Sequence, residues 1–81
     1  MYVEILSKNC CIIHTKEGEY LQSYTSIVGF KNWGIIILYP HWNYSSTTAR
    51  QVGKWLGLSS KEIKQKLKED IIKYEDSEPN I

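Results

Sequence analysis

The residues of this 81-residue chain with the most reactive side chains are two adjacent cysteines and two histidines, Cys10, Cys11, His14 and His41. Cys10 and His14 lie four positions apart in a segment that predicts a strand, which separates them by roughly 13 Å. Zinc ligands must reach one ion at about 2.0–2.3 Å, so a flat strand cannot bring both to one metal. Neighbouring strand residues point to opposite faces, which also disfavours a disulfide between the two cysteines. We therefore expect buried structural thiols in a reducing compartment, with no metal and no cofactor.

Catalytic motifs are absent from the sequence. Nucleophilic catalysis needs a Ser or Cys beside a His and an orienting acid, and neither His14 nor His41 has a recognised catalytic spacing. There is no Gly-x-Ser-x-Gly, no phosphate-binding loop and no His-Glu-x-x-His helix. A small β-rich domain with shallow clefts also buries a substrate poorly. The sequence predicts a protein that is not an enzyme.

Basic side chains gather in the C-terminal half, although the net charge of the chain is only +1. They lie on two predicted helices joined by a turn at Gly57, and the spacing of these helices resembles that of a helix-turn-helix. The basic side chains on them could contact phosphates. Base readout is disfavoured because the second helix offers only Gln65 for it. The other interpretation is an ordinary solvated helix surface. The residues of the nucleic-acid interpretation are Arg50, Lys54, Lys61, Lys64 and Lys68.

Aromatic residues make up 12% of the chain, which is more than so small a core is expected to hold. Tyr and Trp are effective anchors at protein interfaces. Trp33 lies in a predicted turn and is the aromatic residue most expected to be exposed; the alternative is that it folds back onto the sheet. Trp42 and Tyr44 are the other candidates for contact with a protein partner, or they cover the end of the core.

Hydrophobic periodicity defines the elements that must position these residues. Alternation predicts strands at residues 2–6, 10–15, 19–30 and 35–39, the last ended by Pro40. Beyond it the period becomes helical, with N-cap candidates at residues 45–48, a capping box between Thr48 and Gln51, and Gly57 at the C-terminus. A second helix begins with a Ser59–Glu62 capping box. Its apolar stripe is Ile63, Leu67 and Ile71.

The predicted architecture is α+β, an antiparallel sheet of three to four strands followed by two C-terminal helices (ββββαα). Residues 1–74 form a single domain, and residues 75–81 are expected to be an acidic, flexible tail. The longest apolar run, residues 35–39, is far shorter than the roughly 18 residues of a membrane span. Glu4 and Lys8 interrupt any signal peptide, so we expect a cytoplasmic protein without membrane contact. An exposed sheet edge would also allow a homodimer.

The most individual part of the sequence runs from residue 23 to residue 56. It contains Ser23-Tyr24-Thr25-Ser26-Ile27-Val28-Gly29-Phe30, then Trp42-Asn43-Tyr44-Ser45-Ser46-Thr47-Thr48, and ends on Trp55-Leu56. This resembles a family of small phage and mobile-element proteins of unknown function. Their pattern is a Ser-Tyr-x-Thr-x-Val-Ala strand, a hairpin, and Trp-x-Tyr-Ser-x-Thr-Thr leading into a helix that ends in Phe-Leu. The matching residues are Ser23, Tyr24, Val28, Trp42, Tyr44, Ser45, Thr47, Thr48 and Leu56.

The sequence departs from that pattern at four places: Ser26 replaces Thr, Gly29 replaces Ala, Ser46 replaces a frequent Arg, and Trp55 replaces Phe. The hydroxyl cluster before the helix is expected to cap it, or else to receive an anion. The missing Arg argues against an anion-binding role at position 46.

The resemblance implies a mobile-element origin and therefore the host cytosol, with a host or phage protein as partner. We therefore expect a non-catalytic macromolecule-binding protein of phage or mobile-element type, for example an inhibitor of a host defence factor similar to an anti-CRISPR protein. The alternative is a nucleic-acid-binding module that uses the lysine-bearing helices.

Overall fold

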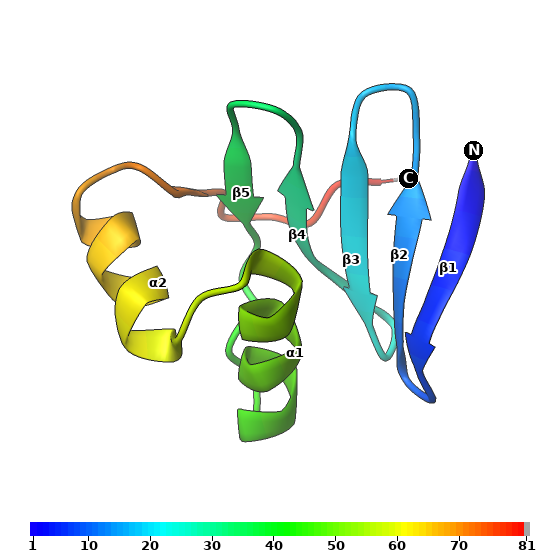
Figure 1. Cartoon of the computed structure of the whole chain (residues 1–81), viewed down its shortest axis with the longest axis horizontal. Helices are drawn as coiled ribbons and strands as arrows, with labels where there is room; N and C mark the ends of the chain where they lie inside the picture. The colour runs from blue at the N-terminus through cyan, green and yellow to red at the C-terminus, as the bar shows by residue number, and fades with distance from the viewer. Residues whose placement is uncertain (81) are drawn as a thin grey trace.

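A single sheet of six strands in sequence order, with two helices between its last two strands, makes up the fold (Figure 1). The computed structural model describes residues 1–80. The strands are β1 (Tyr2–Ser7), β2 (Cys10–His14), β3 (Glu19–Ser23), β4 (Ser26–Lys31), β5 (Ile36–Leu38) and β6 (Lys73–Tyr74). The helices are α1 (Ser46–Leu56) and α2 (Ser60–Lys68). The predicted α+β class and the two helices are confirmed, whereas the predicted count of three to four antiparallel strands is too low.

One extra strand arises because the segment predicted as a single strand, residues 19–30, is the hairpin of β3 and β4. The chain reverses at Tyr24 and Thr25, and neither position holds the glycine that is typical of a hairpin turn. Tyr24 adopts a left-handed φ of 57°. Its N–H donates to Asn9 O (2.7 Å), and its carbonyl accepts from Gln22 Nε2 (2.9 Å). A hydrogen bond to the distant Asn9 and one from the nearby Gln22 thus hold a turn that local propensity does not predict.

The second extra strand, β6, makes the sheet mixed. Ile37 pairs with Lys73 and Leu38 with Tyr74 in parallel. Parallel neighbours need a long crossover, which α1 and α2 supply here.

Helix α2 ends at Lys68, before Ile71, the last residue of the apolar stripe predicted for it. Asp70 takes a left-handed φ of 62°, which turns the chain after Lys68. Ile63 is buried as expected, but Ile71 is exposed, and Ile72 occupies the core instead. The prediction for Ile71 is therefore wrong, because the helical period does not continue through the turn.

Local capping signals set the other helix ends. Ser59 and Glu62 form the predicted capping box, and Gly57 ends α1 with a φ of 71°. The N-cap of α1 is Ser45, whose hydroxyl accepts from Thr48 N–H (3.2 Å). The Thr48–Gln51 pair predicted as a capping box therefore lies inside the helix.

The core lies on both faces of the sheet. On the helix face, side chains from β2 to β5 pack against α1, α2 and the segments that flank them. The buried residues of this cluster, from strands, helices and connecting segments together, are Cys10, Ile12, Leu21, Val28, Leu38, Trp42, Val52, Trp55, Ile63 and Ile72. On the opposite face, which we call the open face, a smaller cluster contains Ile27, Phe30 and Tyr39. The register places Val3, Ile5 and Ile13 on that face as well.

The segment predicted as a flexible tail lies against the sheet over residues 75–80, while residue 81 is outside the described residues. Glu75 N–H donates to Leu38 O (3.0 Å), and Glu78 Oε1 accepts from Ile27 N–H (2.9 Å). Within residues 1–80 no helix has the length and apolar character needed to cross a membrane.

Strand β4 and helix α1 approach each other closely at Gly29, where the ring of Trp55 packs against the backbone. A Cβ added there would lie 2.6 Å from Cζ3 of Trp55 and 3.3 Å from Cδ2 of Leu38, both in the buried core. We expect Gly29→Ala to lower the free energy of unfolding by about 1–3 kcal/mol in urea denaturation, because a packed core resists added volume. Gly34→Ala, where nothing lies within 4 Å, is the matched control and should change little. Equal stability of the two variants would contradict this packing.

Tyr24 stores backbone strain. A left-handed L-residue costs roughly 1–2 kcal/mol, while glycine's extra unfolded-state freedom costs about 0.5–1 kcal/mol. Tyr24→Gly should therefore raise the free energy of unfolding by up to about 1.5 kcal/mol. Thr25→Gly changes the neighbouring turn residue, whose φ is not positive, and should be destabilising. A loss of stability in Tyr24→Gly would mean that packing of the tyrosine ring outweighs the strain.

Candidate functional site

Trp33 projects from the turn between β4 and β5 and has a relative exposure of 107%. The turn is closed by Asn32 N–H donating to Ile35 O (3.0 Å) and braced by Gly34 N–H donating to Asn32 Oδ1 (3.4 Å). Of the two alternatives for Trp33, exposure holds and folding back onto the sheet does not. The indole is a large apolar group presented to solvent on a short, braced turn.

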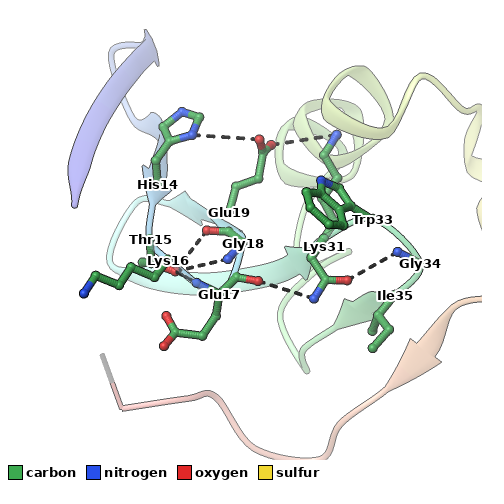
Figure 2. Close-up of a pocket in the computed structure, with 11 residues that line it drawn as sticks. His14, Thr15, Lys16, Glu17, Gly18, Glu19, Lys31, Trp33, Gly34 and Ile35 are labelled. Atoms are coloured by element: carbon green, nitrogen blue, oxygen red, sulfur yellow. Dashed lines mark hydrogen bonds and ion pairs between the residues drawn. The ribbon is translucent and has the colours of Figure 1, made fainter.

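A groove of about 740 Å³ lies beside Trp33, between the β2–β3 turn and the β4–β5 turn (Figure 2). It is lined by residues 14–19 and 31–35. Trp33 and the exposed Ile35 supply its apolar rim. The two turns lie at the same end of the sheet because β3 and β4 connect them as a hairpin.

Glu19 organises the polar wall of this groove. Trp55 Nε1–H donates to Glu19 Oε1 (2.9 Å), and Lys31 Nζ lies 3.8 Å from the same oxygen. His14 Nδ1 is 3.9 Å from Glu19 Oε2, while His14 Nε2 is 3.0 Å from Glu4 Oε1. Lys31 also donates to Trp55 O (3.0 Å), with its ammonium 5.0 Å from the centre of the Trp55 ring. Glu19, Lys31 and His14 each already have a partner, so this wall provides shape and rigidity.

This network was missed in the sequence, although a signal for it exists. Residues that pair across antiparallel strands share a face, and the register sets His14 opposite Glu19 and Glu19 opposite Lys31. A row of polar side chains that can pair with one another is therefore expected once the register is known. Within residues 1–80 no group of three or more His, Cys, Asp or Glu side chains could hold a metal ion.

The three aromatic residues predicted to contact a partner do not form one surface. Trp42 is only 6% exposed and belongs to the core, so the structure corrects its prediction as a contact residue: its ring fills the space beside α1. Tyr44 is exposed and makes an edge contact with the His41 ring at 5.7 Å. It lines a smaller hollow of about 270 Å³ with Tyr24, at the end of β4 opposite to Trp33.

The hydroxyl cluster of the sequence motif joins β3 to α1. Ser23 Oγ donates to Gln51 Oε1 (2.6 Å) and lies 3.3 Å from Thr48 Oγ1. Ser45 Oγ donates to Thr48 Oγ1 (3.3 Å). Ser23 and Thr48 are buried, and across the described chain no buried side-chain polar atom lacks a partner. These hydroxyls support the capping interpretation rather than an anion site.

The five basic residues of the nucleic-acid interpretation are all exposed. Arg50 and Lys54 line a hollow of about 520 Å³ between α1 and the start of α2. Lys61, Lys64 and Lys68 extend along α2, and the ion pairs formed within residues 1–80 involve none of the five.

The N-terminus of α2 is already occupied by a carboxylate. Glu62 Oε1 accepts from Ser59 N–H (3.0 Å), and the hydrogen bonds from Ser59 lower the pKa of Glu62 below its ordinary value. An ionised carboxylate at this position competes with any incoming anion.

The two cysteines are free thiols on opposite faces of β2, with Cys10 buried and Cys11 half-buried. The pKa of the Cys10 thiol is raised, mainly because the thiol is buried and to a smaller extent because Cys11 is nearby. A raised pKa lowers the thiolate fraction, so Cys10 is a poor nucleophile.

Comparison with known proteins gives one match. No curated protein and no solved structure matches the chain. The model of a family of unknown function, DUF8033, matches residues 3–73, which span β1 to the first residue of β6. The chain therefore belongs to the DUF8033 family of unknown function.

Proposed function

We propose that this protein is a non-catalytic protein-binding module that recognises its partner through Trp33 and the adjacent groove. The observation that carries the proposal is the complete exposure of Trp33 beside a groove of about 740 Å³. Exposing an indole to water is unfavourable, and Trp is enriched among the residues that dominate binding energy.

The geometry of the groove supports a macromolecular partner. Trp33 and Ile35 form an apolar rim, and the Glu19–Lys31 pair forms a polar wall whose charges are internally matched. An apolar anchor beside a polar rim is the common composition of a transient protein interface. Glu19, Lys31 and His14 are each engaged by another group of the wall, which favours binding over catalysis.

The biological setting of this proposal rests on the sequence motif alone. The resemblance to phage and mobile-element proteins leads us to propose a phage or mobile-element origin, action in the host cytosol and a host protein as the partner. Inhibition of a defence factor, in the manner of an anti-CRISPR protein, is the specific form of that proposal.

Trp33→Ala provides the test. The immobilised protein should capture a specific protein from host lysate after nuclease treatment, and Trp33→Ala should reduce that capture by at least about tenfold, as expected for an interface anchor. Ile71→Ala, which shortens another exposed apolar side chain, should retain capture. Unfolding curves of both variants should match the wild type, since neither side chain is buried. Undiminished capture by folded Trp33→Ala would refute the role of Trp33.

Nucleic-acid binding is the second candidate, favoured by the exposure of Arg50, Lys54, Lys61, Lys64 and Lys68 without ionic partners among the described residues. Lysines contact phosphates without reading sequence, so this function would be backbone binding with little base preference.

Salt titration against DNA and RNA checks this candidate. Backbone binding through these residues should weaken steeply with salt, because each neutralised phosphate releases counterions. Reversing Lys61, Lys64 and Lys68 to Glu should abolish it, whereas reversing the exposed Lys8 and Lys16 in the β1–β2 and β2–β3 turns should have a smaller effect. Affinity that survives the triple reversal would exclude this mechanism.

A further inference from the structure

The two edge strands of the sheet, β6 and β1, differ in length, charge and exposure. The β6 edge is only two residues long, and it carries Lys73, a charge of the kind that blocks edge pairing. The β1 edge is six residues long, and every one of its residues is exposed. Figure 1 shows both helices toward the β5 end of the sheet, with α2 beyond β5, and β1 at the opposite edge. No strand of the described chain pairs with the outer edge of β1, although residues 78–80 line a hollow with Met1 and Val3 on the open face.

The hydrogen bonds of β2 show which backbone groups of β1 are free. Thr15 N–H donates to Gly18 O (2.8 Å), and Asn9 O accepts from Tyr24 N–H (2.7 Å). In an antiparallel ladder the bonding direction alternates from one residue to the next. The odd-numbered residues of β2 therefore bond to β3, and the even-numbered residues bond to β1.

The same alternation applies across the β1–β2 pair. The even-numbered residue Ile12 is paired with Glu4, so Glu4 directs its backbone toward β2. The odd-numbered residues Val3 and Ile5 consequently direct their N–H and C=O groups away from the sheet. These groups are aligned to accept another strand.

The side chains of β1 lack the usual protection against such pairing. Tyr2, Val3, Ile5 and Leu6 are apolar and exposed, and the strand contains no Lys and no Pro. Its one charge, Glu4, lies 3.0 Å from His14 Nε2 of the same molecule. A long, mostly apolar edge of this kind favours strand addition.

We propose that β1 pairs antiparallel with β1 of a second copy of this chain, about a two-fold axis at Val3. This register sets Val3 opposite Val3, and Ile5 opposite Met1, so the open face gains a continuous apolar row across the interface. Tyr2 lies opposite Glu4 on the helix face. The two copies then share one continuous sheet with their helices on the same side.

A second copy fits this edge because β1 can pair with itself about Val3 without placing like charges opposite each other. Two neighbouring registers of the same pairing fit less well. An axis at Glu4 would place two carboxylates directly opposite each other, which is destabilising. An axis at Ile5 would draw in the segment between Ile5 and Ser7, where the strand register is irregular. The register at Val3 is free of both faults. The inference goes beyond the proposed function and is independent of it, because Trp33 lies in the turn between β4 and β5 and not on β1.

Molar mass measured across protein concentration tests the proposal. We expect the wild type to approach twice the 9.5 kDa monomer mass at high concentration. Val3→Lys should raise the dimer dissociation constant at least about 100-fold, because two lysines would meet at the axis. Ile71→Lys introduces the same charge at a residue of similar exposure, 56% against 54% for Val3, and should leave the dimer intact. A wild type that stays monomeric to about 1 mM, or a dimer that persists in Val3→Lys, would overturn the inference.

A cysteine test fixes the register and does not depend on the lysine variant. In a Cys11→Ser background, Val3→Cys places two thiols across the axis at the Cα separation of about 5.5 Å that a disulfide accepts. Mild oxidation should therefore crosslink Val3→Cys and leave Ile5→Cys uncrosslinked. Crosslinking at position 5 and not at position 3 would refute the register. Because Trp33 is unchanged in both variants, loss of dimerisation and loss of partner capture are separable.

Discussion

The contact between Trp55 and Gly29 joins the two layers of this protein. The Trp55 ring lies where a side chain on β4 would otherwise project, so α1 can approach the sheet only because position 29 has no Cβ. At the ring edge the indole N–H donates to Glu19, and the Trp55 carbonyl accepts from Lys31. One side chain therefore packs the core and orients the polar wall of the groove.

This double role links stability to the candidate site. Glu19 and Lys31 are on adjacent strands, and the register alone would leave their long side chains free to move. Trp55 gives both a fixed partner, and fixing rotamer-rich side chains before binding removes an entropic cost that a partner would otherwise meet. Trp33 differs, because it is held only by the backbone of its turn. The groove thus combines a fixed wall with an exposed anchor.

Features with local causes could be predicted from the sequence. The Ser59–Glu62 box and the left-handed Gly57 act within one helical turn, and both are present as expected. Trp33 lies in the predicted turn, and of the two alternatives that the sequence left open for its side chain the structure shows exposure. What failed depends on distant contacts. Tyr24 turns where its N–H bonds to the distant Asn9, and β6 forms only after two helices have returned the chain to β5. Trp42 has the composition of an interface residue, and only the packing of α1 shows that it is core.

The same long-range closure explains why the two sheet edges differ. The crossover returns the chain beside β5, and β6 with the following residues covers that edge, with Glu75 bonded to Leu38 and Glu78 bonded to Ile27. Residues 78–80 then line a hollow with Met1 and Val3 on the open face, but no strand of the described chain pairs with the outer edge of β1. A small domain with a limited core has few elements to spare, and covering one edge leaves the other uncovered. The openness of β1 is thus a consequence of chain order, and the apolar residues on it are a separate property of the sequence. Their coincidence on one strand, rather than either feature alone, makes β1 a surface for strand pairing.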